Sequence, residues 1–396
     1  MARVLSQPAD APTAGAREAT PEVPSRQLPR LGWADNLRVG VIAGVIVAHV
    51  GTAYLVEFDW YYMERTTNRV SQLVAGAVTG MGVLFGMGLL FLVAGLFTPG
   101  ALQRKGAGRF AVDRLVRLGL PLVVFVFVID ALADYIGWRG AGAGDDDFLT
   151  YYGRWWGEDA DLSVMWFVAA LLVFSLGFAA FRRARPAPIA DPTPLTWHHA
   201  AGAVGVIAAT SFLVRLVWPF FSQALSGLNL WEFPQMVTLF ALGALAAERG
   251  WLDGPLSDRM RRACARTAVV GALAFLAILM AINPGDPDPA FTGGLRPQAA
   301  VLPLVEAFIA VGTSLWVVDW FRRRWNVQGA LARRLARASY ATYVIHPPVV
   351  VLLSVAMRSA PVPIEVKFLV VAVVGVAGAF AIGWAATRWK VLARIV

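Results

Sequence analysis

The stretch LRVGVIAGVIVAHVG, residues 37–51, decides the fold class, because its only charged or titratable side chains are Arg38 and His49. A histidine inside a membrane helix is costly unless it has partners or a function there. An α-helix rises about 1.5 Å per residue, which places these two side chains about 16 Å apart along the axis. If Arg38 marks the boundary with water, His49 lies near the middle of a hydrocarbon core about 30 Å thick. We therefore interpret His49 as a titratable group at mid-membrane and as the first candidate for chemistry.

The composition agrees with a membrane protein of many spans. Of the 396 residues, 58% are hydrophobic and only 15% are charged, whereas soluble domains are about 25% charged. The sequence predicts an all-α bundle of about ten transmembrane helices, at about 37–56, 76–97, 117–136, 164–181, 200–218, 233–248, 266–282, 301–319, 339–356 and 366–387.

The distribution of basic residues predicts the orientation. Arginines and lysines concentrate in every second loop, as in 104–114 and 322–337, while the alternate loops are poor in them. By the positive-inside rule, this places both termini in the cytoplasm, with the protein in the plasma or inner membrane. The same pattern accounts for the net charge of +9, so we expect the lipid bilayer and not nucleic acid as a partner.

Two further expectations concern organisation and metals. Residues 1–35 are rich in Ala, Pro and charge and are interpreted as a disordered cytoplasmic tail, which leaves 36–390 as the transmembrane domain. The single cysteine, Cys264, excludes a disulfide framework. Since the sequence also has no HExxH or CxxC motif, we expect no metal site and no permanently bound cofactor.

Arg114 and Arg117 open the predicted third span in DRLVRLGLP, residues 113–121. Their i, i+3 spacing predicts that both guanidinium groups share one helical face, where they can hold a phosphate or pyrophosphate. The alternative is that both arginines only obey the positive-inside rule.

His346 lies in ASYATYVIHPPVVV, residues 338–351, with Ser339, Tyr340 and Tyr343 before it. The prolines at 347 and 348 remove backbone donors, and we expect them to bend or break the helix there. Irregular backbone inside a membrane is tolerated only beside protein or a water-filled cavity, so this stretch points to an internal polar cavity. His346 either takes part in the chemistry or bonds across helices as a structural residue.

Carboxylates occur in two predicted spans. Glu306, within PLVEAFIAVG (303–312), must be paired or protonated at membrane depth, and either His49 or Arg215 can be its partner. Asp130 and Asp134, at the outer end of the third span, are expected at the membrane interface.

Together these stretches resemble the acyltransferase-3 family of integral membrane acyltransferases that use acyl-CoA. The likeness covers about residues 31–390 and is carried by four stretches, namely residues 37–51 with arginine and histidine eleven apart, 90–122 with Arg-x-x-Arg, 165–176 beginning Met-Trp-Phe, and 338–351 with its Ser-Tyr, Tyr and His. Many members have a histidine where this chain has Met165, so a binding role for that position is not expected here.

The resemblance implies transfer of an acyl group, most often acetyl, from cytoplasmic acyl-CoA to a hydroxyl of a carbohydrate or cell-envelope glycan. A smaller set of members acts on small molecules such as macrolides. Neither the acceptor, nor the length of the acyl group, nor the oligomeric state follows from the residues.

Acyl transfer needs a base, a grip on CoA and stabilisation of an oxyanion. We predict His49 as the general base, with Glu306 orienting it or taking its proton. The predicted binding residues for acyl-CoA are Arg38, Arg114, Arg117, Tyr343 and His346. Because no Cys or Ser nucleophile with a local base is evident, direct transfer is favoured over an acyl-enzyme, with an acyl-histidine as the alternative. A rival hypothesis is a proton-coupled transporter or flippase, which also uses intramembrane His, Glu and Arg.

Overall fold

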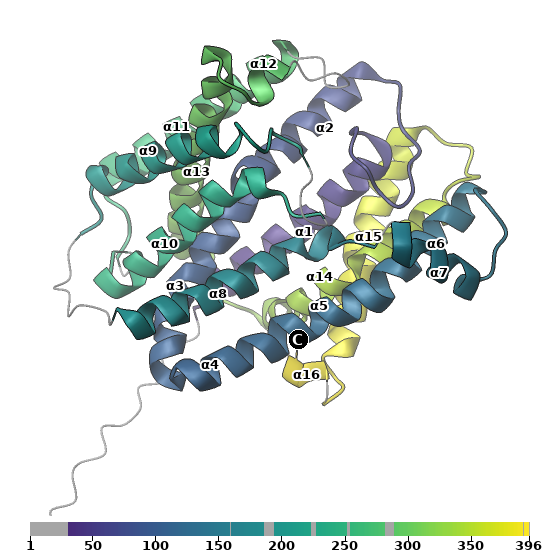
Figure 1. The fold of residues 1–396 in the computed structure, drawn as a ribbon, viewed down its shortest axis with the longest axis horizontal. Helices are drawn as coiled ribbons and strands as arrows, with labels where there is room; N and C mark the ends of the chain where they lie inside the picture. The colour runs from purple at the N-terminus through teal and green to yellow at the C-terminus, as the bar shows by residue number, and fades with distance from the viewer. Residues whose placement is uncertain are drawn as a thin grey trace, which may run out of the picture. The chain divides into compact units, whose positions relative to one another are not determined.

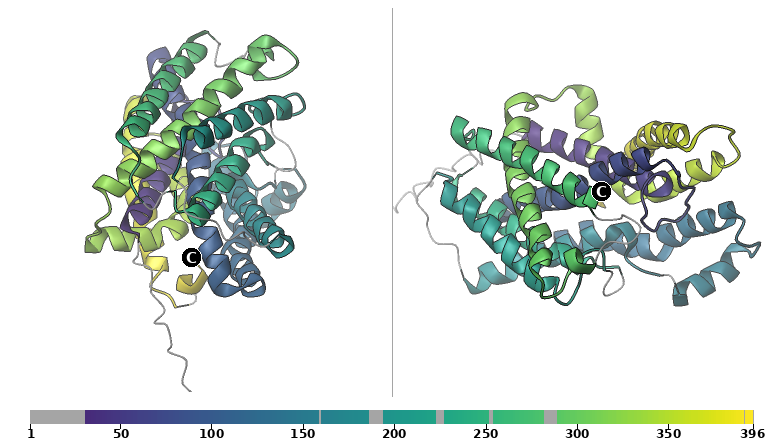
Figure 2. Two further views of the ribbon diagram at one scale, coloured as in Figure 1. Left: turned by 90° about the vertical axis from the view of Figure 1, so that its left-hand side faces the viewer. Right: turned by 90° about the horizontal axis from the view of Figure 1, so that it is seen from above.

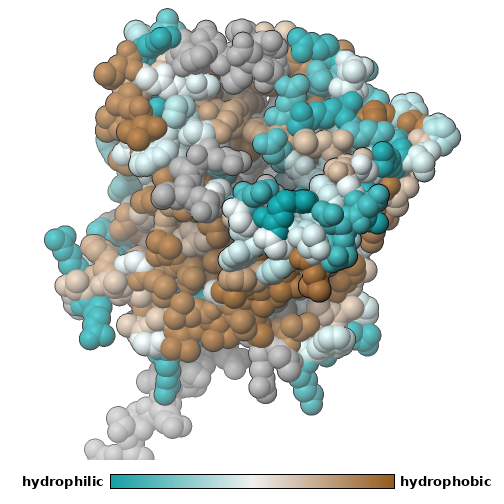
Figure 3. Space-filling view, turned by 45° about the vertical axis from the view of Figure 1, so that its right-hand side comes forward, coloured by the Kyte–Doolittle hydropathy of each residue, from teal (hydrophilic) through white to brown (hydrophobic). Residues whose placement is uncertain are grey.

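The computed structural model describes residues 31–158, 160–185, 194–222, 227–251, 254–281, 289–390 and 392–395. These residues form helices and contain no strand (Figure 1). Ten of the helical stretches among them are long and apolar enough to cross a membrane. A broad apolar area covers the lower half of the visible face, with many hydrophilic residues above it and a few along its lower rim (Figure 3). The predicted all-α bundle of ten spans is confirmed.

Five of the ten spans are built from more than one helical segment or begin with a short 3₁₀ turn. In chain order the spans are α1 (Gly32–Tyr54); α2 (Arg69–Met81), η1 (Gly82–Gly86) and α3 (Met87–Lys105); α4 (Ala107–Arg114), η2 (Leu115–Gly119), α5 (Leu120–Val124), η3 (Phe125–Ile129) and α6 (Asp130–Ala141); η4 (Ser163–Met165) and α8 (Trp166–Ala184); α9 (Trp197–Val214); η5 (Leu230–Glu232) and α10 (Phe233–Arg249); α11 (Asp258–Ala281); η6 (Pro297–Ala300) and α13 (Val301–Arg324); α14 (Ala330–Ala356); and α15 (Ile364–Ala386). Three short helices lie outside the spans, α7 (Phe148–Glu158), α12 (Pro289–Thr292) and α16 (Leu392–Ile395).

The first helix begins earlier than the sequence indicates. Most of the predicted tail, residues 1–30, lies outside the described residues. Helix α1 starts at Gly32, and Trp33 and Ala34 are already buried in it. The backbone N–H of Trp33 donates to Oδ1 of Asn326 at 3.3 Å. The folded unit therefore starts four residues before the predicted boundary at 36.

The second and third spans, 37 and 35 residues long, exceed the lengths predicted from hydropathy. Both contain π-helical turns, η1 in the second span and η2 and η3 in the third. A π turn bonds i to i+5 instead of i to i+4, so it widens the helix and changes the directions of the side chains after it.

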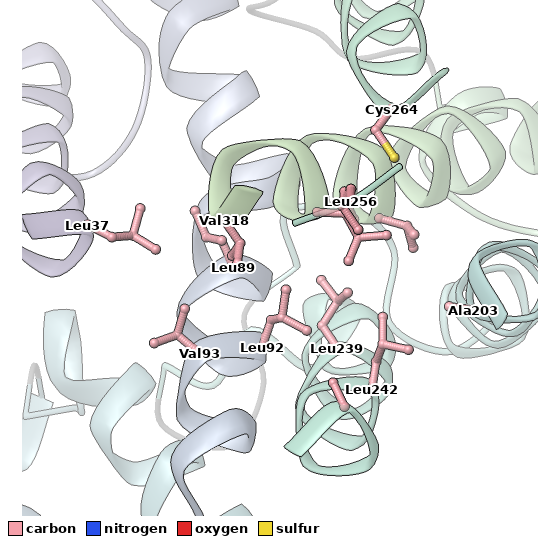
Figure 4. Close-up of a cluster of buried hydrophobic side chains, with 14 of the residues drawn as sticks. Leu37, Leu89, Leu92, Val93, Ala203, Leu239, Leu242, Leu256, Cys264 and Val318 are labelled. Carbon is pink, nitrogen blue, oxygen red and sulfur yellow. The ribbon is translucent and has the colours of Figure 1, made fainter. Parts of the chain in front are cut away.

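Helices α3 and α10 pack with their backbones in close approach. A Cβ added to Gly95 of α3 would collide with the carbonyl oxygen of Phe240, and one added to Gly243 of α10 would collide with that of Leu92. Small residues at such crossings let membrane helices reach van der Waals contact. Leucines of both helices form a buried apolar cluster beside them, which also includes Val318 of α13 (Figure 4).

Helix α1 packs against α14 and α15, so the two ends of the folded unit lie side by side (Figures 1 and 2). This contact joins two of the stretches singled out in the sequence, 37–51 and 338–351. Ile46 and Val50 of α1 and Val350 of α14 are fully buried in the apolar cluster they share.

The two ends of the bundle differ in charge. The last turns of α3, α8, α10 and α13 all carry arginine or lysine. Because successive spans run in opposite directions, these turns gather at the end where α1 begins, which we call the basic end. We call the other end, where α1 finishes at Tyr54, the acidic end, because the carboxylates described below lie there.

Candidate active site

His49 of α1 and His346 of α14 form a pair inside the bundle. Nδ1 of His49 lies 2.9 Å from Nε2 of His346, and the rings stack with centroids 5.0 Å apart. His346 has no exposed surface, whereas His49 is half-buried and lines a cavity. The sequence singled out both histidines but gave no reason to join them.

Pro347 explains how His346 is oriented. In a helix the carbonyl of Tyr343 accepts from the N–H of residue 347, and proline has none. The Tyr343 carbonyl instead lies 2.6 Å from Nδ1 of His346. Helix α14 runs unbroken from Ala330 to Ala356 through both prolines. The expectation of a broken helix was therefore wrong, because the neighbouring side chain replaces one of the missing donors.

This hydrogen bond fixes the protons of both rings. A carbonyl oxygen only accepts, so Nδ1 of His346 carries the hydrogen, and in the neutral ring its Nε2 is an acceptor. Nδ1 of His49 must then donate to that Nε2. In the neutral pair, Nε2 of His49 is left without a hydrogen and with a free lone pair.

Trp60 completes the surroundings of His49. Its indole ring stacks on the imidazole with centroids 4.7 Å apart and planes 11° apart. Trp60 follows α1 in the connection to α2, where sequence periodicity gives no indication that it folds back onto the helix. The His49 imidazole therefore contacts two rings, those of His346 and Trp60.

The cavity beside His49 has a volume of about 1660 Å³. Helix α1 lines it from Leu37 to Thr52, a length of about 22 Å at the helical rise. Its walls along the bundle are mainly apolar and include Val74 of α2 and Leu273 of α11. The cavity therefore runs from near the basic end to the acidic end, with His49 along its course. No residue of 338–351 lines it, so it is not the cavity expected beside the prolines.

The acidic end of the cavity contains residues that the sequence placed elsewhere. Asp130 was expected at the membrane interface, but it is 3% exposed, lines the cavity and accepts a hydrogen bond from the Tyr61 hydroxyl. Asp134 lines the cavity as well. The π turn η3 directly precedes Asp130, and sequence periodicity assumes an unbroken α-helix.

Arg114 and Arg117 differ in exposure and in partners. Arg114 is the last residue of α4, and Arg117 lies in the π turn η2. The Arg117 side chain is 56% exposed and pairs with Asp113 at 3.1 Å, while Arg114 packs over Phe110 and its buried Nε has no partner. A surface hollow of about 450 Å³ is lined by Arg117 and not by Arg114. That the two guanidinium groups together hold a phosphate stays a prediction.

Arg38 also lies at the basic end. Its side chain is 43% exposed, and Nη1 is 3.5 Å from Oδ1 of Asp35 in the same helix. It lies in the second turn of α1, six residues after the helix begins at Gly32.

Glu306 has Arg215 as its partner. Nη2 of Arg215 donates to Oε2 of Glu306, and both side chains are buried. The guanidinium also lies 4.7 Å from the ring centroid of Phe220. Of the two partners left open by the sequence, the structure has Arg215 and not His49, so Glu306 has no contact through which to orient the histidine.

Tyr343 and His346 lie with His49 and not with the arginines of the basic end. The Tyr343 hydroxyl donates to the carbonyl of Val164, and its own carbonyl accepts from His346. Met165, next to Val164, is fully buried in the same apolar cluster. The positions of Tyr343 and His346 therefore do not support their predicted contact with acyl-CoA.

Fold and site together define a multi-pass membrane protein with a histidine pair inside the bundle, one member of which lines a long internal cavity. The sequence model of a family described as an acyltransferase domain matches residues 31–388, nearly the whole chain. The chain belongs to this acyltransferase-3 family. Comparison with curated proteins and with solved structures gives no match.

Proposed function

We propose that the protein transfers an acyl group, most often acetyl, from acyl-CoA to a hydroxyl of a carbohydrate or glycan, with His49 as general base. The observation that carries this proposal is the hydrogen-bonded histidine pair, which leaves Nε2 of His49 as an acceptor, beside a cavity that α1 lines from Leu37 to Thr52. A small molecule with a hydroxyl is a second acceptor compatible with a cavity of this size.

In the proposed step, Nε2 of His49 takes the proton of the acceptor hydroxyl as its oxygen attacks the thioester carbonyl. The tetrahedral intermediate then collapses and breaks the carbon–sulfur bond. The CoA sulfur leaves as a thiolate and receives the proton from His49, so the products are an ester and CoA thiol. No protein nucleophile is needed, and general-base catalysis of this kind contributes typically about 10²–10⁴-fold.

His346 is a positioning residue in this mechanism, because it contacts His49 and not the reacting atoms. Its acceptor Nε2 holds the hydrogen of His49 on Nδ1 and leaves Nε2 as the basic atom. When His49 becomes protonated, both its ring nitrogens are donors, and the bond to His346 then gains from the charge.

We place the acyl donor at the basic end, on the cytoplasmic side by the positive-inside rule. Arg38 and Arg114 are the proposed partners of the CoA phosphates, and the unpartnered Nε of Arg114 supports this role. The pantetheine arm would extend along the cavity toward His49, while the acceptor enters from the acidic end.

The test is release of CoA thiol from acetyl-CoA by the purified chain in detergent. A transferase releases thiol in proportion to an added hydroxyl acceptor, while a transporter or flippase releases none. Release that depends on the acceptor supports the proposal, and its absence across neutral, amine-bearing and anionic glycosides contradicts it.

A further inference from the structure

The charged residues that line the cavity are all acidic. Among the described residues around it there is no lysine and no arginine, although the chain as a whole has a net charge of +9. The carboxylates gather at the acidic end and are Asp59, Asp130, Asp134, Asp161, Glu232 and Glu365. An acceptor that enters from this end therefore passes through a negative electrostatic field, which low-dielectric walls strengthen.

Two of these carboxylates accept hydrogen bonds from neutral groups. Asp130 accepts from the Tyr61 hydroxyl, and Glu365 accepts from Thr66 at 2.7 Å, but both donors are neutral. Burial, together with the neighbouring Asp130 carboxylate, raises the pKa of Tyr61 well above its ordinary value. The Tyr61 phenol consequently stays protonated at neutral pH and remains a donor.

One of these carboxylates, Glu232, is buried and incompletely hydrogen-bonded. It lines the cavity, is 3% exposed, and its Oε2 has no hydrogen-bond partner. Glu232 interacts electrostatically with Arg215 and Glu306. Arg215 binds Glu306 through Nη2, while its buried Nε and Nη1 have no hydrogen-bond partner. Two carboxylates share one guanidinium here, so the group either carries one net negative charge or keeps one carboxyl protonated, and an ammonium group can take the place of that proton.

Aromatic rings lie beside this carboxylate. Trp231 and Phe221 both line the cavity, with ring centroids 5.6 Å apart. Further along the wall are Trp60 and Tyr61. The faces of such rings attract ammonium groups, most strongly where water is excluded, and they also stack on the apolar faces of sugars.

We propose that the acceptor carries a protonated amine in addition to the hydroxyl that is acylated. The ammonium binds Glu232 and the ring faces of Trp231 and Phe221, while the hydroxyl reaches Nε2 of His49. Acceptors with a carboxylate or phosphate at the same position are excluded by the lining charges. This inference rests on the proposed acyl transfer, because it concerns the acceptor of that reaction. The binding preference itself can be measured without turnover.

The experiment uses three glucosides that differ only in their aglycone, 2-aminoethyl, 2-hydroxyethyl and carboxymethyl. Binding to the purified full chain in nonionic detergent is measured by calorimetry at neutral pH, with and without acetyl-CoA. We expect the amine to bind about tenfold more tightly than the hydroxyethyl glucoside, and the carboxymethyl glucoside to bind most weakly.

Glu232→Gln keeps the shape of the side chain and removes its charge, and it should reduce the amine preference to below threefold. Asp145→Asn is the matched control, because Asp145 is fully exposed, pairs with Arg139 and does not line the cavity. It should keep the full preference. If Glu232→Gln does not fold, the wild-type comparison still decides.

Equal binding of the three glucosides, tighter binding of the anionic one, or no binding of the amine would overturn the proposal. So would a full preference in folded Glu232→Gln. If the amine binds through Glu232 but no CoA thiol is released, the proposed acyl transfer fails and the charge preference stands, so the two failures can be told apart.

Discussion

Replacing His346 by phenylalanine removes the group that accepts the Nδ1 hydrogen of His49. The 2.9 Å bond between the rings is lost, and phenylalanine fills much of the space without offering an acceptor. Leaving a buried donor without a partner costs about 1–3 kcal/mol. If this cost adds in full to the activation free energy of the step in which His49 accepts the proton, kcat falls by about 5- to 150-fold.

The matched variant is His346→Gln. Glutamine has both a donor and an acceptor, so it can donate to the Tyr343 carbonyl and still accept from His49. We expect its kcat to recover to within about tenfold of the wild type, while KM for acyl-CoA stays the same in both variants because the arginines of the basic end are untouched.

The assay is CoA thiol release under saturating acyl-CoA, with the thermal unfolding midpoint measured on the same samples. A folded His346→Phe with wild-type kcat would refute the positioning role. Equal loss in the Phe and Gln variants would also contradict it, because only one of them removes the acceptor.

Three other substitutions test separate parts of the structure. Pro347→Ala restores an N–H that competes for the Tyr343 carbonyl, so kcat should fall several-fold while thermal stability is kept or rises. Pro348→Ala restores a different hydrogen bond of the same helix and should raise thermal stability without that loss of kcat. Equal kcat in the two variants would argue against the role of the Tyr343 carbonyl. Gly243→Ala forces a Cβ against the Leu92 carbonyl and should destabilise the protein by about 1–3 kcal/mol in thermal unfolding. Gly205→Ala, whose Cβ would lie in open space, should not destabilise it. An unchanged thermal unfolding midpoint for Gly243→Ala would contradict the close α3–α10 packing. Arg114→Ala should weaken binding of acyl-CoA by about tenfold in calorimetry, and unchanged affinity would remove Arg114 from the donor site.

The number of spans was predictable because it depends on a local property, since hydropathy over about twenty residues identifies a span. A fixed helical rise places His49 about 16 Å along the helix from Arg38, and its depth in the membrane stays a prediction. Glu306 was also limited correctly to two partners, since a carboxylate at that depth requires one.

What could not be predicted depends on local departures from regular helix or on tertiary contacts. The π turns η2, which contains Arg117, and η3, which ends just before Asp130, have no clear sequence signal. The pairing of His49 with His346 joins residues 297 positions apart, and Trp60 reaches His49 from a loop. Pro347 did carry a signal, because its missing N–H leaves one carbonyl free, but only the structure shows which donor takes that place.

The central claim is that His49 is the base of an acyl transfer. The most direct measurement is acceptor-dependent CoA thiol release by purified His49→Ala beside the wild type, with unfolding midpoints to confirm that both are folded. The account predicts that release in the variant falls by at least about 10²-fold at a near-normal midpoint. Wild-type release by folded His49→Ala would contradict it.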